Sequence, residues 1–307
     1  MARHSACQEQ SMIIRAYQPA DCGAALSVIK AAAEADRTRQ LPAEALSLSL
    51  RENAVIAFTG EGAAAAFAWW HPQHDQSYLF EGWVHPAFRR RGYGGGLLTA
   101  AEVFVRQHGG GLLRARTYED ITGAKALFER KGYIVERRFY TMRTALTPER
   151  VLEAELPKGI TVRTFERSDL EMLVAADNEI FAEHWGAVPR DPETWERYMI
   201  LSRPHNPNLW IIALQGDEIV GECLCGAREH GDTQNGHISI VGVRRSWRGY
   251  GLGRALLTYG LRALRDHGFT TASLHVDSEN HTAINLYRSL EMDVVRTRLH
   301  YVKKIKA

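Results

Sequence analysis

The 307-residue sequence has few cysteines, no long apolar segment and almost no net charge. Its four cysteines form no C-x-x-C pair and no spacing suited to zinc, which favours reduced thiols and no metal. The longest apolar run, 63–70, is far shorter than the roughly 18 residues of a membrane span, and residues 1–11 lack the apolar core of a signal peptide. A net charge of +2 indicates no general polyanion partner. We therefore expect a cytoplasmic protein that binds neither nucleic acid nor membrane.

The segment 241–257 runs from an apolar strand through a glycine turn directly into an amphipathic helix. Glycines in the turn let the backbone bend sharply, and the following helix directs the positive end of its dipole at an anion held there. A dinucleotide-binding G-x-G-x-x-G is excluded, because its third glycine would fall on Arg254, and no Walker A motif occurs in the chain. The segment therefore predicts a site for a phosphate-bearing ligand.

A second copy of this segment lies 159 residues earlier in the chain. The same shift continues into the next helix, where Leu127 matches Leu286, whereas at the starts of the two halves the shift is 148, as for Arg15 and Arg163. A repeat of this length indicates two copies of one domain. We place the domains at 1–150 and 151–307, with the proline-containing and charged segment 144–159 as the linker.

The repeated pattern V-x-x-x-x-R-x-x-G-x-G resembles the pyrophosphate loop of the GNAT acetyltransferase superfamily. This resemblance implies an α+β fold (an α/β sandwich): two tandem GNAT acyl-CoA N-acyltransferase domains, each a mixed, mostly antiparallel sheet flanked by helices. It also implies acetyl-CoA as cosubstrate. The residues that it assigns to the cosubstrate are Val241, Val243, Arg248, Gly249, Tyr250, Gly251, Leu252, Gly253, Arg254 and Asn280 in the second copy, and Val84, Arg89, Arg90, Arg91, Gly92, Tyr93 and Gly94 in the first.

The segment 274–292 is similar to the superfamily pattern L-x-V-x-x-x-N-x-x-A-x-x-L-Y-x-x-L. The resemblance implies that Tyr287 is the general acid and that Asn280 contacts the pantetheine. A tyrosine hydroxyl, with an ordinary pKa of about 10, can protonate a leaving thiolate when the two are within hydrogen-bond reach. The alternative is that Tyr287 is a core aromatic beside Leu286 and Leu290.

Three residues are candidates for the general base: His237, Glu222 and Glu183. His237 begins the fourth strand, at a place where tandem acetyltransferases similar to mycothiol synthase carry a glutamate. A histidine, with an ordinary pKa of about 6.5, can accept a proton near neutral pH, directly or through water. His237 can equally be a polar residue after an Asn-Gly turn. The aromatic and charged segment 181–199 either faces the acceptor or is an ordinary surface loop.

The 159-residue shift sets Tyr287 against Phe128, which has no hydroxyl, and His237 against Tyr78. We therefore expect the first domain to be catalytically degenerate and the second to catalyse. The predicted function is N-acetyl transfer from acetyl-CoA to a primary amine of a small molecule by direct attack on the thioester, either mycothiol-synthase-like or antibiotic-modifying. The alternative is a non-catalytic, CoA-sensing or scaffold protein. We expect a monomer or a homodimer.

Overall fold

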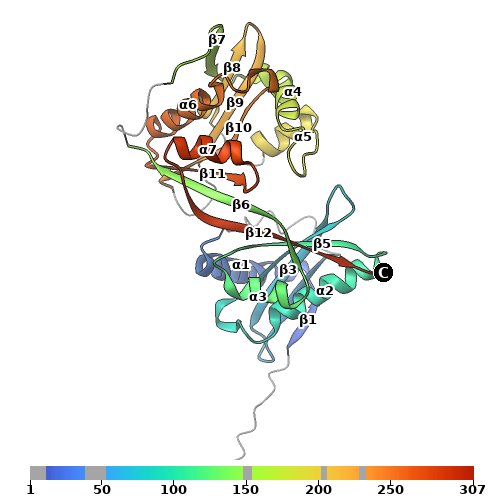
Figure 1. The fold of residues 1–307 in the computed structure, drawn as a ribbon. Coiled ribbons are helices and arrows are strands. Elements are labelled where there is room, and N and C mark those ends of the chain that lie inside the picture. The colour runs from blue at the N-terminus through green and yellow to red at the C-terminus, as the bar shows by residue number, and fades with distance from the viewer. Residues whose placement is uncertain (1–11, 39–52, 148–153, 202–205, 228–232) are drawn as a thin grey trace, which may run out of the picture. The chain divides into compact units, whose positions relative to one another are not determined.

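The computed structural model describes residues 12–38, 53–147, 154–201, 206–227 and 233–307 (Figure 1). The chain divides into two compact units. The first unit consists of residues 1–138 together with 296–307, and the second unit of residues 139–295. Across the described ranges, no helix has both the length and the apolar character to cross a membrane.

The sheet of the first unit contains one parallel strand pair, β4 with β5, whereas β1–β2, β2–β3, β3–β4 and β5–β12 are antiparallel pairs. Helix α1 packs on one face, against Ile56 and Phe67, and helix α2 packs on the other. The strand order is β1 (Ile13–Ala16), β2 (Ala54–Phe58), β3 (Ala64–Pro72), β4 (Tyr78–Val84), β5 (Gly111–Tyr118) and β12 (Asp293–Ile305); the helices are α1 (Cys22–Asp36), α2 (Tyr93–Gln107) and α3 (Thr122–Arg130).

The second unit repeats this plan, with β10 and β11 as its parallel pair. A short π-helical turn, Arg197–Leu201, follows α5. The strand order is β6 (Ile134–Ala145), β11 (Thr271–Asp277), β10 (Asn235–Val243), β9 (Glu218–Ala227), β8 (Trp210–Gln215) and β7 (Ile160–Thr164); the helices are α4 (Leu170–Ile180), α5 (Pro192–Glu196), α6 (Leu252–Asp266) and α7 (His281–Ser289). The predicted mixed, mostly antiparallel sheet flanked by helices is confirmed in both units.

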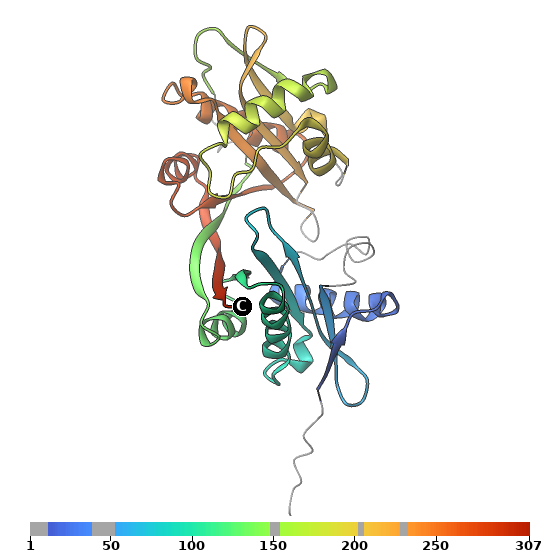
Figure 2. The ribbon, with the colours of Figure 1, turned by 90° about the vertical axis from the view of Figure 1, so that its right-hand side faces the viewer.

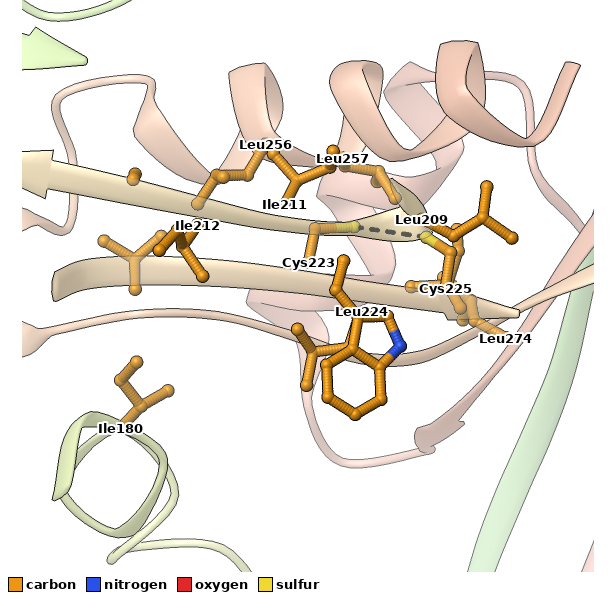
Figure 3. Packing of buried hydrophobic residues seen from close by; sticks show 14 of the residues in the cluster. Ile180, Leu209, Ile211, Ile212, Cys223, Leu224, Cys225, Leu256, Leu257 and Leu274 are labelled. Atoms are coloured by element: carbon orange, nitrogen blue, oxygen red, sulfur yellow. Dashed lines mark hydrogen bonds between the residues drawn. The ribbon is translucent and has the colours of Figure 1, made fainter. Parts of the chain in front are cut away.

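Strand alternation along β9 separates the two faces of the second sheet. Cys223 and Cys225 both point toward α6, with their Sγ atoms 3.7 Å apart (Figure 3). A Cβ added to Gly260 of α6 would lie 2.5 Å from the Cys223 sulfur, so helix and strand approach closely there. Figure 3 shows Leu256 of α6 on this side of the strands and Ile180 of α4 on the other. Glu222, one residue from Cys223, therefore faces α4.

The compact units differ from the predicted division at 150 and 151. Strand β6 begins in the first unit, but its residues 139–145 pair with β11 of the second unit. Strand β12 begins in the second unit, and its residues 298–305 pair with β5 of the first unit. In Figure 2 the red C-terminal strand can be followed into the first unit. The sheet of each unit is thus completed by a strand that begins in the other unit, and sequence periodicity does not indicate which sheet such a strand joins.

Candidate active site

The glycine turn of the second unit connects β10 to α6. Gly249 and Gly251 have φ angles of +85° and +83°, in the left-handed region that glycine adopts without steric cost. Gly251 is the N-cap of α6 without a side-chain cap, and the Ala255 N–H makes the first helical hydrogen bond, 3.0 Å to the Gly251 carbonyl. The N–H groups of this first turn have no helical acceptor, so they are placed to bind an anion. This geometry fits a pyrophosphate.

The first unit has the same turn geometry. Gly92 is the uncapped N-cap of α2 with φ +90°, and the Gly96 N–H donates to its carbonyl over 3.0 Å. Arg90, the counterpart of Gly249, adopts φ +63° although L-residues other than glycine rarely do so. The first unit therefore has the same turn backbone as the second, although Arg90 stands where the second unit has Gly249.

The arginine of the repeated V-x-x-x-x-R-x-x-G-x-G pattern has a structural role in both units. The Nε atom of Arg248 donates to the Val243 carbonyl (3.2 Å), and its Nη2 donates to the carbonyl of Ile180 at the end of α4 (3.1 Å). Arg89 donates in the same way to Val84 (3.3 Å) and forms a bidentate ion pair with Asp36 (2.9 and 2.8 Å). These guanidinium groups donate hydrogen bonds to acceptors of the protein itself, and these bonds connect the glycine loop to a neighbouring helix.

The other predicted cosubstrate residues divide into exposed and buried groups. Tyr250 is 68% exposed beside the turn, whereas Tyr93 and Leu252 are buried, so that only their backbone groups face the turn. Arg254 donates to the side chain and the carbonyl of Ser289, the last residue of α7. Arg91 lies over the Phe88 ring. A Cβ at Gly253 would lie 3.6 Å from Leu286, and one at Gly94 would lie 3.2 Å from Leu127, which makes both glycines close-packing positions between helices.

The parallel strands part just before each glycine turn. In the second unit the paired register ends at Ile238 and Leu274, although β10 continues to Val243 and β11 to Asp277. In the first unit the β4–β5 register ends at Phe80. Beyond these points the edge of the strand is open to a ligand, which fits the predicted cosubstrate contacts of Val84, Val241 and Val243.

A β-bulge in β10 changes the predicted correspondence of His237. The register with β9 shifts between Ile238 and Ile240, whereas the β3–β4 register of the first unit runs from Val84 to Tyr78 without a shift. His237 pairs with Ser273 of β11, and the equivalent pair in the first unit is Leu79 with Arg114 of β5. The strand pairings therefore make Leu79 the counterpart of His237. The prediction that His237 corresponds to Tyr78 was wrong, because an uninterrupted sequence shift cannot account for an inserted bulge residue. Bulges of this kind re-aim side chains near functional sites.

His237 lies on the face of the sheet that is opposite α6. Its neighbour Gly236 faces α6, since a Cβ there would lie 2.6 Å from Leu264. The His237 ring is partly exposed, its Nδ1 lies 3.3 Å from the Ser273 Oγ, and its centroid lies 5.1 Å from that of His275. The ring therefore stands where the parallel strands part, with one nitrogen held by the neighbouring strand.

Glu222 is fully buried and faces the carboxyl group of Asp177 on α4. In the described part of the chain, neither carboxyl oxygen of Glu222 makes a hydrogen bond, whereas the Asp177 Oδ2 accepts one from the buried Trp195 indole (3.3 Å). Burial first, and the facing carboxyl second, raise the pKa of Glu222 well above its usual range, and burial raises that of Asp177. Burial therefore disfavours the ionised form of Glu222. Glu183, the third base candidate, is exposed and pairs with Arg245 at 3.2 Å.

Replacing Glu222 by glutamine should stabilise the protein increasingly as the pH rises. Because the pKa of Glu222 is raised on folding, the folded chain retains a proton that the unfolded chain releases above about pH 4, so stability falls as pH rises through that window. Glutamine does not titrate, and we expect a gain of about 1 kcal/mol or more at pH 8, or about 2–4 °C in Tm. Thermal melts at pH 5 and pH 8 test this; an equal or smaller gain at pH 8 contradicts it.

Tyr287 lies on α7 and is only 7% exposed. Burial, followed by the nearby Cys223 thiol, raises its pKa above the usual range, so that the phenol keeps its proton. Asn280 is the N-cap of the same helix, where its Oδ1 accepts from the Ala283 N–H over 3.0 Å. In the first unit the corresponding helix has Ile121 as an N-cap without a side-chain bond and a buried Phe128. Both helices bury an aromatic ring at this position, but only that of α7 carries a hydroxyl.

The repeated fold, the parted parallel strands and the glycine turns together define a protein built from two acyl-CoA transferase domains. The model of the Acetyltransferase (GNAT) family matches residues 28–133 and 170–292, and the chain belongs to this family. The predicted tandem organisation and acetyltransferase activity are thereby confirmed.

Curated relatives extend over most of the chain. The mycothiol acetyltransferase of Thermobispora bispora is 34% identical over 288 residues, which are 89% of this chain and 92% of the relative. That of Thermomonospora curvata is 32% identical, over 86% of this chain and 88% of the relative. The crystal structure of a GCN5-related N-acetyltransferase from Sphaerobacter thermophilus has a TM-score of 0.76 and 31% identity, covering 96% of both chains. A tandem GNAT protein from the clavulanic acid biosynthesis pathway shares the fold, with a TM-score of 0.76 and 16% identity over 97% of this chain and 99% of that chain.

Proposed function

We propose that this acetyltransferase moves an acetyl group from acetyl-CoA to a primary amine of a small molecule by direct attack on the thioester, and that the second unit performs the reaction. One observation carries the proposal. The second unit combines the uncapped N-terminus of α6 with the parted strands β10 and β11 and with the hydroxyl of Tyr287. The first unit keeps the turn and the parted strands but has Phe128 in place of the hydroxyl.

The residues of the second unit then have separate roles. Bound acetyl-CoA supplies an activated acetyl thioester. The N–H groups of the first turn of α6 hold the pyrophosphate, and the open edge of β10 near Val241 orients the pantetheine. Tyr287, kept protonated by burial, gives its proton to the leaving thiolate.

Among the three base candidates, we favour His237. Its ring is partly exposed on the face where the strands part, so an amine or a bridging water can reach it. Glu222 has no exposed surface and faces the carboxyl group of Asp177, and Glu183 faces Arg245 and Arg248 at the glycine turn. A base needs access to the amine, and an imidazole, with an ordinary pKa of about 6.5, is a side chain that can accept a proton near neutral pH.

The acceptor class rests on the relatives named mycothiol acetyltransferase, which point to a small-molecule amine. The test is a screen of primary amines, including aminosugars, cysteinyl amines and aminoglycosides, with free coenzyme A thiol as the readout. Acceptor-dependent thiol release supports the proposal. Coenzyme A binding without thiol release by any of these amines contradicts the proposed acceptor class.

Gly251→Val should weaken coenzyme A binding by at least tenfold. A β-branched residue at φ +83° costs roughly 1–3 kcal/mol of strain, and relief of that strain rotates the N–H groups that face the anion. No heavy atom lies within 4 Å of the added Cβ, so loss of binding reflects backbone geometry and not a clash. Isothermal titration with coenzyme A, with Tm as the folding control, measures the effect; unchanged affinity would remove the turn from the binding site.

A further inference from the structure

We propose that the first unit carries a binding site for a free α-amino acid, in which the Glu81 carboxylate receives the ammonium group and the Arg116 guanidinium receives the carboxylate. The two side chains have opposite charges and lie on neighbouring strands, yet no hydrogen bond or ion pair joins them. This site goes beyond the proposed function, which concerns the second unit. Its occupancy can be measured without any acetyl transfer.

The sheet of the first unit places both side chains on one face. Phe80 and Ala115 form the last pair of the parallel register between β4 and β5, and both are buried in the core on the α2 side. Since successive residues of a strand point to opposite faces, Glu81 and Arg116, the next residue on each strand, point away from α2. The strands have only just parted at this place, so the gap between the two charges is short. It suits a ligand whose amine and carboxylate are attached to the same carbon atom.

Neither side chain has a bonded partner in the unit. Glu81 and Arg116 form no hydrogen bond and no ion pair with any residue in the ranges that the structure describes. Arg116 is exposed and Glu81 is partly buried, so a small ligand can reach both. Burial lowers the pKa of Arg116, and the charge of Glu81 opposes this shift, so the guanidinium has lost part of its hydration without gaining a bonded partner. A ligand carboxylate supplies that partner, and a ligand ammonium does the same for Glu81.

Arg114 and His300, which flank Arg116, do not compete with it for a carboxylate. Arg114, two residues earlier on β5, already forms ion pairs with Asp75 (2.6 Å) and Glu136 (2.9 Å). His300 of β12 pairs with Arg116 across the strands. Burial, followed by the neighbouring arginines, lowers the pKa of His300 to about 3, so its ring is uncharged near neutral pH.

Two further groups near the pair leave its charges in place. Burial lowers the pKa of His71 on β3, so this ring is also uncharged near neutral pH. Arg298 of β12 lies near Arg116 and has interactions of its own, so we assign the ligand contact to Arg116. The charge of Arg298 adds to that of Arg116 and favours a carboxylate at this end of the site. A ligand with only one of the two charges would leave either Glu81 or Arg116 without a partner.

The second unit provides an internal comparison. The 159-residue shift sets Glu81 against Ile240, which follows the bulge, and Arg116 against His275. The repeated fold therefore stands without a carboxylate and a guanidinium at these two places. Partly desolvated charges that the fold does not require are typical of binding and catalytic sites. This contrast favours a ligand over a structural role for the pair.

The test is isothermal titration of the full-length protein, without acetyl-CoA, with each of the common α-amino acids. We expect at least one to bind, and acetate and methylamine, which carry one charge each, to bind about tenfold or more weakly. Glu81→Gln and Arg116→Gln should each weaken the binding about tenfold or more, the scale of one hydrogen bond between charged groups. Both variants should keep a Tm close to wild type, since neither loses a bond within the fold. The matched controls, Glu34→Gln on α1 and Arg106→Gln on α2, change exposed charges and should leave the affinity unchanged.

Three results overturn the proposal. No amino acid binds the wild-type protein at millimolar concentration, either variant keeps the wild-type affinity, or a variant fails to fold, which would make the pair a support of the sheet. Thiol release from acetyl-CoA is measured separately. If amines are acetylated and no amino acid binds through Glu81 and Arg116, the proposed function stands and this site fails. If an amino acid binds through both residues and no amine is acetylated, the site stands and the proposed function fails.

Discussion

Tyr287→Phe is expected to lower the rate of acetyl transfer by about 10²-fold or more and to change coenzyme A affinity little. The substitution removes one hydroxyl from a side chain that is 7% exposed, and the first unit shows that a phenylalanine fits the equivalent helix. The packing of α7 should therefore survive, while the leaving thiolate loses its proton donor. Steady-state release of free thiol, together with titration of coenzyme A, separates the two effects.

The matched control is Phe128→Tyr, which adds a hydroxyl at the equivalent place in the first unit. Phe128 is buried against the rings of Tyr133 and Tyr301, with centroids 5.6 and 5.2 Å away, so the new hydroxyl meets an aromatic cluster. We expect it to leave turnover within about twofold and not to rescue Tyr287→Phe. Full activity of Tyr287→Phe would return Tyr287 to the role of a core aromatic.

Removing residues 296–307 is expected to unfold the first unit. This segment carries the part of β12 that pairs with β5, and Leu299, Tyr301 and Ile305 are buried in the core of the first unit. Loss of each such side chain costs about 2–5 kcal/mol, and a whole domain has a stability of only about 5–15 kcal/mol. Differential scanning calorimetry and limited proteolysis should show a protein in which the first unit no longer melts cooperatively.

The control for this truncation removes only Lys306 and Ala307, which follow β12. It should leave the melting of the first unit close to wild type.

A fragment 1–150 that folds on its own would contradict the account, since it lacks β12. A fragment 1–150 joined by a flexible linker to residues 296–307 should recover a cooperative transition if the missing strand is the cause.

The repeat, the fold class and the glycine turns could be predicted because they depend on local rules. Gly92 and Gly251 stand at helix starts with φ angles of +90° and +83°, which glycine adopts without cost, and their spacing is visible in the sequence. The ion pairs Arg15–Asp21 and Arg163–Asp169, both 2.7 Å or shorter, likewise recur at the predicted shift of 148.

The remaining features depend on tertiary pairing, which no local pattern encodes. Because of the bulge before Ile240, His237 occupies the position equivalent to Leu79 of the first unit. One inserted residue places every earlier residue of the strand on the opposite face of the sheet. Strand β6 pairs with β11 of the second unit, and β12 pairs with β5 of the first. The two repeated sheets are similar, so no local pattern says which of them each strand joins. The pairing of Asp177 with Glu222 arises because α4 packs over β9, so that two acids 45 positions apart in the sequence meet in a buried layer.

The central claim, that the second unit carries the chemistry, is tested most directly by turnover of Gly251→Val and Gly92→Val measured side by side. The two glycines are N-caps of equivalent helices with nearly equal φ angles, so the substitutions impose the same local strain. We predict that Gly251→Val lowers the rate of thiol release at least tenfold more than Gly92→Val, with both proteins folded. A larger loss with Gly92→Val would contradict the account and move the active site to the first unit.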